Sequence, residues 1–357
     1  MNVVRFAASL LLSAVTVSPL IAAVPAKTGG KLRIAVIDVE GGQSTLFVSP
    51  TGQSLLVDTG WPGNNYRDAD RIVAAAHDLG VQRIDTVVLS HYHLDHIGGV
   101  PQLVERIPVG TFIDHGEMYE QGGGVPKIYA DYQAVLATGK YKHISVHAGE
   151  KLPAAGFDGT VISSDGAVLT KALAGAGQAN SLCAAAPTVA EDTTENGHSV
   201  GFVLRFAGLK ILDAGDLTSD RERSLVCPAN LVGKVDLAIV SHHGSDLSSS
   251  KVFVHALHPR VAVMDNGESK GGSTSVIDTW KSAPGLEALF QLHAAPAAGT
   301  PNPAGTQQGG AEHNVPEAQI ANRVGEDGKR IDVTVNANGS MDVVNGRMGQ
   351  TQHFVRR

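Results

Sequence analysis

The chain has 357 residues, of which 43% are hydrophobic and 18% are charged. This composition supplies a sizeable apolar core, which excludes a largely disordered chain. Lys and Arg number 28 against 35 Asp and Glu, so the net charge is −7. That sign disfavours a protein that coats nucleic acid non-specifically.

The amino terminus has the order of a secretory signal. Arg5 precedes the apolar run Phe6–Val15, and small residues follow up to Ala26. We expect residues 1–26 to be a cleaved signal peptide and the mature protein to be secreted or periplasmic, with no membrane attachment after cleavage. Removal of Arg5, the one charged residue of the leader, changes the net charge from −7 to −8. A retained anchor is the alternative, which Pro19 and several hydroxyl side chains weaken.

The chain has two cysteines, Cys183 and Cys227. They can pair in an oxidising compartment, or they can remain as a free, buried pair. Neither lies among the residues that could bind a metal, so neither is given a catalytic role.

The first third of the chain alternates strands with helices. Strands are expected at Lys31–Val39, Ser44–Ser49, Ser54–Val57 and Ile84–Leu89, and helices at Arg67–Leu79 and Val100–Ile107. The stretch from about 114 to 195 is less regular and reads as an insert with one helix, Tyr129–Thr138.

The rest of the chain repeats the alternation. A hairpin is expected from Gly201–Phe206 and Leu209–Leu212, strands at Val235–Val240 and Arg260–Met264, helices at Lys251–Leu257 and Ser273–Lys281, and a closing hairpin from Ile331–Val335 and Met341–Val344. Residues 294–310 are rich in Ala, Gly and Pro and read as an irregular segment. The pattern predicts a layered α/β architecture and one domain over residues 27–357.

The most informative segment is LSHYHLDHIGG, which directly follows a buried strand. Side chains alternate along an extended backbone, so His91 and His93 point the same way. The turn that follows can fold Asp95 and His96 back towards them. Imidazole and carboxylate together favour zinc, with iron or manganese as alternatives.

Three later segments place further candidate ligands where strands start or end. His198 lies in ENGHSVG, Asp216 in DAGDL, and His242 and His243 in VSHHGS. Open α/β sheets place their sites at strand ends, so these residues form a coherent set with the first segment.

These motifs, together with Asp58 and Gly60 in VDTG, resemble the metallo-β-lactamase-fold hydrolase superfamily. The resemblance spans roughly residues 32–292 and implies an αββα sandwich with a long insert between the second and third metal motifs. Within that superfamily, the ENGHS, GD and SHHGS combination is similar to the hydrolase domain of competence-type DNA-uptake channel proteins.

The resemblance implies two metal ions, most simply Zn²⁺. His91, His93 and His198 would hold the first; Asp95, His96 and His242 would hold the second, with His243 as the alternative to His242. Asp216 would bridge the ions, and Asp58 would orient a ligand.

Such a pair of ions activates a shared water as hydroxide. We expect Asp95 or Asp216 to orient this hydroxide and His243 to protonate the leaving group. Lys270 or Asn266 would stabilise negative charge on the substrate.

We therefore predict an exported, metal-dependent hydrolase that acts on a small-molecule ester. The first expected substrate class is a phosphodiester or nucleotide-like ester. A lactone or β-lactam is the second enzymatic alternative. Two others are oxidation chemistry on iron and a non-catalytic binding protein that retains the fold. Nucleic acid is disfavoured by charge, and the sequence does not predict an oligomeric state.

Overall fold

The computed structural model describes residues 1, 30–295 and 311–357. The predicted leader beyond Met1 and most of the predicted irregular segment lie outside these residues, so both stay predictions. Among the helices that the structure describes, none is long and apolar enough to cross a membrane.

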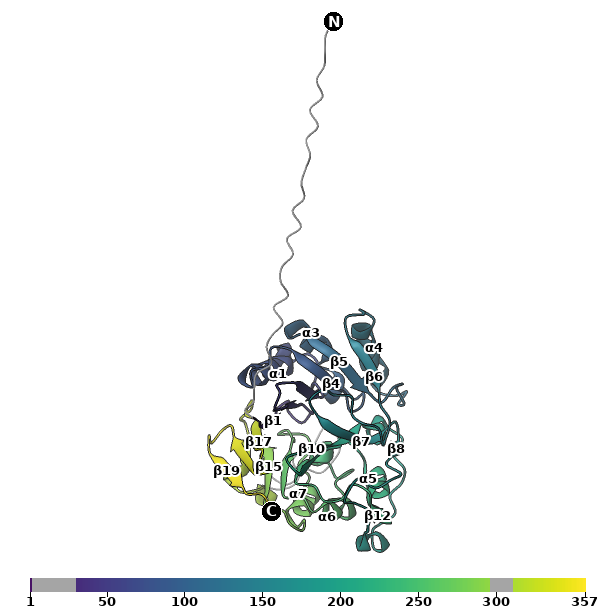
Figure 1. The fold of residues 1–357 in the computed structure, drawn as a ribbon, viewed down its shortest axis with the longest axis vertical. Coiled ribbons are helices and arrows are strands. Elements are labelled where there is room, and N and C mark those ends of the chain that lie inside the picture. Colours follow the sequence, from purple (N-terminus) through teal and green to yellow (C-terminus); the bar gives the residue numbers. More distant parts are fainter. Residues whose placement is uncertain (2–29, 296–310) are drawn as a thin grey trace.

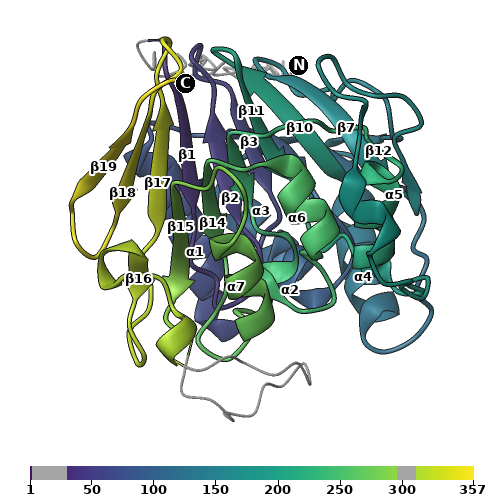
Figure 2. The ribbon, with the colours of Figure 1, turned by 90° about the horizontal axis from the view of Figure 1, so that it is seen from below.

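Two large sheets form the centre of the molecule (Figures 1 and 2). The first has the order β19-β18-β17-β1-β2-β3-β4-β5-β6. Its strands are β1 (Leu32–Val36), β2 (Thr45–Val48), β3 (Ser54–Val57), β4 (Ile84–Val88), β5 (Val109–Asp114), β6 (Lys142–Ser145), β17 (Ile331–Val335), β18 (Met341–Asn345) and β19 (Thr351–Phe354). Pairing from β3 to β6 is parallel, and the other pairs are antiparallel.

The second sheet has the order β16-β15-β14-β13-β11-β10-β7-β8. Its strands are β7 (Asp158–Ser164), β8 (Ala167–Val168), β10 (Gly201–Phe206), β11 (Leu209–Asp213), β13 (Leu237–Ile239), β14 (Val261–Met264), β15 (Ala288–His293) and β16 (Ile320–Asn322). A small ribbon pairs β9 (Gln178–Ala179) with β12 (Ala229–Asn230). Strands β11, β13, β14, β15 and β16 run parallel.

Helices cover the outer face of each sheet. On the first sheet pack α1 (Arg67–Asp78), α3 (Val100–Arg106) and α4 (Val125–Leu136), with the short α2 (Leu94–Ile97) at its edge. On the second sheet pack α5 (Ser219–Val226), α6 (Lys251–Leu257) and α7 (Thr274–Lys281). The inner faces meet in a third apolar cluster, in which Phe47 and Phe202 contact edge to face across the sheets at 6.3 Å. This αββα layering confirms the predicted fold class.

Most predicted elements lie within a few residues of the observed ones. The hairpin β10–β11 turns at Ala207 and Gly208, whose φ values of 51° and 83° suit a tight antiparallel turn. Helix α4 begins four residues before its predicted start, because Pro126 is tolerated in a first helical turn. Strands β5, β6, β7, β15, β16 and β19 were not predicted from the sequence. Strands β6 and β7 lie within the predicted irregular insert, yet they belong to the first and the second sheet.

Candidate metal centre

Parallel strands of both sheets deliver polar side chains to one place. Asp58 follows β3 and His91 follows β4, whereas Asp216 follows β11 and His243 follows β13. The chain then enters the short helix α2, with His93 as its N-cap, and Asp95 and His96 lie on this helix. Asp58 adopts φ 58°, and its carboxylate accepts the backbone N–H of Ser90 at 2.7 Å.

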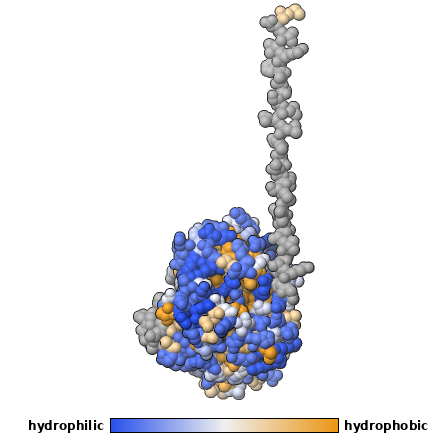
Figure 3. All heavy atoms as spheres, turned by 90° about the vertical axis from the view of Figure 1, so that its left-hand side faces the viewer, coloured by the Kyte–Doolittle hydropathy of each residue, from blue (hydrophilic) through white to orange (hydrophobic). Residues whose placement is uncertain are grey.

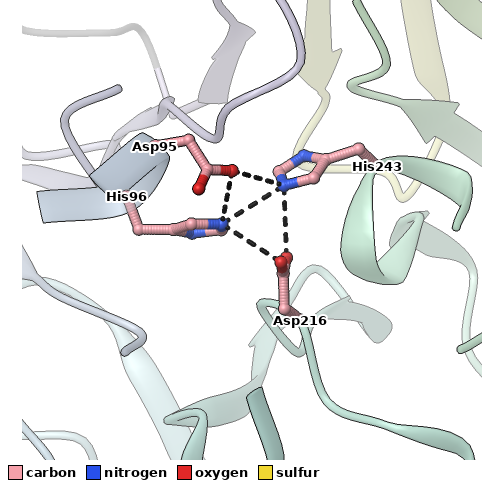
Figure 4. A group of neighbouring side chains, drawn as sticks. All are labelled: Asp95, His96, Asp216 and His243. Carbon is pink, nitrogen blue, oxygen red and sulfur yellow. Dashed lines mark hydrogen bonds and ion pairs between the residues drawn. The ribbon is translucent and has the colours of Figure 1, made fainter. Parts of the chain in front are cut away.

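Four of these side chains form a buried cluster, which we call the four-residue group: Asp95, His96, Asp216 and His243. One ligand-type atom of each lies within 4.8 Å of the others (Figure 4). His96 Nε2 lies 3.2 Å from Asp216 Oδ2 and 3.3 Å from Asp95 Oδ2. His243 Nε2 lies 3.3 Å from both Asp216 Oδ1 and Asp95 Oδ2. Two imidazoles and two carboxylates thus face one point.

The arrangement fits a divalent cation. The two Nε2 atoms of His96 and His243 lie 3.2 Å apart and face the same carboxylates. Beside them, His91 Nε2 is buried without a hydrogen-bond partner among the described residues, 3.9 Å from Asp216 Oδ2. Buried polar atoms normally have partners, and a cation bound by nitrogen and oxygen would supply one.

Neighbouring charges shape the cluster. Burial alone would raise the pKa of Asp95, but Lys270 and His96 outweigh it and hold that pKa well below its usual value. Burial, with His96 and His93 nearby, lowers the pKa of His91 well below its usual value. Asp95 is therefore ionised and His91 neutral at pH 7. Burial would lower the pKa of His96 and of His243, but Asp216 outweighs it and raises the first well above its usual value and the second to about 10. A bound cation would take the place of these two protons.

His96 and His91 are each tied by one ring nitrogen. His96 Nδ1 lies 2.7 Å from Asp58 Oδ2, and His91 Nδ1 lies 3.0 Å from Ser90 Oγ. In both rings the Nε2 atom therefore faces the cluster. This is the arrangement that the predicted orienting role of Asp58 requires.

Four predicted ligands lie outside the four-residue group: His91, His93, His198 and His242. His91 and His93 lie next to each other, with ring centroids 4.6 Å apart. His93 Nε2 faces Glu120 Oε2 at 3.0 Å. His198 Nδ1 lies 3.2 Å from Asp165 Oδ1, and its ring stacks on Tyr119 at 3.9 Å.

The VSHHGS segment brings both of its histidines to the centre, in different ways. His243, predicted as the proton donor, lies within the four-residue group. His242, favoured as the last ligand, lies beside the group with its Nε2 3.3 Å from Asp216 Oδ2 and its Nδ1 3.1 Å from Ser248 Oγ. Both residues have left-handed φ values, 57° and 54°, which are uncommon and concentrate at functional sites.

Of the two predicted charge-stabilising residues, one lies at the cluster. The Lys270 ammonium donates to Asp95 Oδ2 and lies 5.3 Å from the centre of the Trp61 ring. Asn266 is buried, and its amide nitrogen donates to the His293 carbonyl at 2.8 Å. Its amide group is therefore used within the fold.

Glu195, which was not predicted from the sequence, organises the loop that contacts His198 and His93. This buried carboxylate accepts the N–H groups of Tyr119 at 2.6 Å and Glu120 at 2.9 Å, and His115 Nε2 lies 2.9 Å from it. Tyr119 and Glu120 are the residues that contact His198 and His93. The one signal in the sequence is an acidic residue three positions before His198.

Cys183 and Cys227 form a disulfide, with Cα atoms 5.7 Å apart. Of the two alternatives left open by the sequence, the structure has the paired one. The bond ties residues 181–184, a short helical turn, to the end of α5.

Comparison with known proteins agrees with this geometry. Residues 37–166 match the family described as the Metallo-beta-lactamase superfamily. That range contains Asp58 and the HYHLDH segment, but it ends before His198. Competence protein ComA of Neisseria gonorrhoeae is 30% identical over 236 residues, which is 66% of this chain and 27% of that protein.

A shorter stretch is similar to hydroxyacylglutathione hydrolase of Stenotrophomonas maltophilia. It is 40% identical over 63 residues, which cover 18% of this chain and 21% of that protein. The chain thus spans about a quarter of the competence protein and about a fifth of the hydrolase. Among solved structures, MEM-A1, a subclass B3 metallo-beta-lactamase from a soil metagenome library, has a TM-score of 0.37 at 16% identity, with 72% of this chain and 81% of that one covered.

Proposed function

Because the chain carries a metallo-beta-lactamase superfamily domain over residues 37–166, we propose that it is a metal-dependent hydrolase of a small ester, with a phosphodiester or nucleotide-like ester as the first substrate class. The observation that carries the proposal is the four-residue group with the unpartnered His91 Nε2 beside it. Two imidazoles and two carboxylates around one buried point serve no apolar core.

His91, His93 and His198 would hold one ion, and Asp95, His96 and His243 would hold the other. Asp216 would bridge them, because its Oδ1 lies 3.3 Å from His243 Nε2 of the second set and its Oδ2 lies 3.9 Å from His91 Nε2 of the first. When bound, a pair of divalent ions lowers the pKa of a coordinated water and polarises the ester. Zinc suits this donor set best, with iron or manganese as alternatives.

The chain's own residues do the remaining work. Asp58 and Ser90 hold the rings of His96 and His91 in the orientation that leaves Nε2 inward. Asp95 or Asp216 would accept the hydrogen bond that aims the attacking water. Of the two adjacent histidines, the one that does not bind an ion is available to protonate the leaving group; the grouping favours His242 for this step.

A carboxylic ester, lactone or β-lactam is the second candidate substrate. The stretch of 40% identity to hydroxyacylglutathione hydrolase favours it, since that relative is named for the hydrolysis of an acyl compound. Both classes react with the same activated water.

The test is metal analysis of the mature protein together with a substrate panel. The panel would hold bis-p-nitrophenyl phosphate, p-nitrophenyl butyrate, a lactone and a chromogenic β-lactam. About two zinc ions per chain and chelator-sensitive turnover of one substrate would support the hydrolase and identify its class. Absence of bound metal and turnover after zinc reconstitution would leave the non-catalytic binding protein as the better proposal.

We also propose that the protein is exported after cleavage near residue 26. The disulfide supports this proposal, because such bonds persist mainly in oxidising compartments. The intact mass of the protein recovered from culture medium or periplasm tests it. A mass that retains the leader would contradict cleavage.

A further inference from the structure

A groove of about 660 Å³ lies next to the candidate metal centre. One wall is the segment 182–189, and the other is the loop 246–252 that follows the paired histidines. Helix α7 closes the groove with Val276. No described residue of the four-residue group lines it.

One side-chain contact joins the groove to the metal centre. Ser248 lines the groove, and its Oγ lies 3.1 Å from His242 Nδ1. The other ring nitrogen of His242 lies 3.3 Å from Asp216 Oδ2. The loop is also fixed on the other side, where the N–H of Ser219, three residues after Asp216, donates to the Leu247 carbonyl at 3.0 Å. The imidazole of His242 therefore lies between the groove and the cluster.

Apolar side chains gather in this groove. Leu182, Val189 and Leu247 are exposed by 36%, 39% and 54%, and Val252 and Val276 lie beneath them. These three are a third of the nine large apolar side chains that are exposed in the described residues. By contrast, the face in Figure 3 is mostly hydrophilic with smaller hydrophobic areas. Exposed apolar groups gathered in a hollow are typical of ligand sites.

The outer wall is tied in place. Besides the disulfide at Cys183, the Arg223 guanidinium donates to the carbonyls of Cys183 at 3.2 Å and Ala186 at 3.4 Å. Arg223 is thereby used by the wall, and the other charged lining residues, Asp246 and Lys251, have opposite signs, so the groove favours an occupant without a large net charge.

We propose that this groove binds the hydrocarbon chain of an ester whose scissile bond lies at the metal centre. The proposal rests on the hydrolase function proposed above and narrows its substrate class to esters with an apolar chain. Each methylene buried from water is worth about fourfold in affinity, so chain length should control substrate preference.

Binding is tested apart from catalysis with the fluorescent probe 11-(dansylamino)undecanoic acid, titrated against the purified mature protein. Leu247→Asp should weaken binding at least tenfold. The matched control is Val324→Asp, because Val324 is similarly exposed, at 59%, and lies outside the groove. Val189→Asp gives a second groove variant. Equal binding by all four proteins, or no binding by the wild type, would overturn the proposal.

Catalysis is tested with p-nitrophenyl butyrate and octanoate, and with p-nitrophenyl phosphodiesters carrying butyl or octyl chains. We expect the longer chain to raise kcat/KM at least tenfold, mainly through KM, in one of the two series. Leu247→Asp should bring that ratio near one, and Val324→Asp should keep it. The responding series identifies whether the ester is a carboxylate or a phosphate.

The two proposals fail in different ways. Turnover of both chain lengths at equal kcat/KM by the wild type would overturn the groove assignment and leave the hydrolase standing. No turnover of any ester, with probe binding lost only in the groove variants, would overturn the hydrolase and leave an apolar-ligand site.

Discussion

At the scale of single residues, the hydrogen-bond partner of each imidazole determines which ring nitrogen faces the metal centre. His96, His91 and His242 are tied at Nδ1 and keep Nε2 inward, whereas His93 is tied at Nε2 by Glu120. Since the tied nitrogen sets the tautomer, His93 would offer Nδ1 to a metal. These tying residues come from elements far apart in sequence, so spacing alone could not identify them.

Removing a bridging or ligating side chain should remove the metal. We expect Asp216→Asn or His93→Ala to abolish metal-dependent turnover and to lower bound zinc, because the first removes the negative charge of the bridging carboxylate and the second removes a predicted imidazole ligand. Elemental analysis and activity measure this, and circular dichroism checks the fold. Asp158→Asn, which changes an exposed acid, is the control. Full activity in either ligand variant would refute the assignment.

Glu195 should act on the metal through the loop that it holds. Glutamine cannot accept from His115 and from both backbone N–H groups with the same geometry, since one of its two polar atoms is a donor. We expect Glu195→Gln to weaken zinc affinity about 10- to 100-fold, as measured by competition with a chelating dye. The exposed Glu150→Gln serves for comparison. Unchanged affinity would show that Tyr119 and Glu120 do not position His198 and His93.

At the scale of elements, two tethers hold the segments around the groove. The disulfide fixes one wall, and buried Glu222 of α5 fixes the other by accepting the N–H groups of Ser249 at 2.7 Å and Ser250 at 2.9 Å. Helix α5 was missed by the sequence analysis, because its polar sequence SDRERSLV has little apolar periodicity. Its tertiary contacts, and not its propensity, give it this role.

Removing the disulfide should loosen the wall. Its 44-residue separation gives a loop-closure contribution of about 2–4 kcal/mol to the free energy of unfolding. We expect the double variant Cys183→Ser, Cys227→Ser to unfold at correspondingly lower denaturant concentration and to be cleaved by protease within residues 181–189. A variant as stable and as resistant as the wild type would contradict the role of the tether.

Glu222 should make stability depend on pH. Burial raises its pKa to about 7, against the opposing backbone N–H groups of Ser250 and Ser249. Since the pKa is raised on folding, the stabilisation is complete below about pH 4.5 and is lost as pH rises through 7.

The isosteric Glu222→Gln variant isolates this effect, because other titrating groups cancel in the comparison. We expect it to gain stability relative to the wild type by up to about 3 kcal/mol between pH 4.5 and pH 8. Urea unfolding at the two pH values measures the difference. A difference that does not change with pH would contradict the raised pKa.

At the scale of the whole molecule, the metal centre joins the two sheets. Asp95 and His96 belong to the half that carries the first sheet, and Asp216 and His243 to the half that carries the second. A cation held by both halves stabilises their packing by mass action, since the unfolded chain has no formed site.

Chelation should therefore destabilise the protein as a whole. With zinc at about 100 times its Kd, the gain is about 3 kcal/mol, which for a chain of this size corresponds to roughly 4 °C in Tm. Calorimetry with EDTA and with zinc measures the shift. The Asp216→Asn variant should show little shift, and an equal shift in both proteins would contradict binding at this centre.

The sequence by itself determined the layered fold class and most of the residues at the centre. The hydrophobic periodicity that distinguishes strands from helices is a local property of the sequence. The motifs HYHLDH and SHHGS directly follow strands, so the local backbone alone brings their side chains to the strand ends. Only the tertiary structure decided that His243 joins Asp95, His96 and Asp216, that Glu195 and Glu120 support the other histidines, and that the cysteines pair. Each of these contacts depends on which segments come together when the two sheets pack. The packing is determined by the burial of apolar side chains from the whole chain.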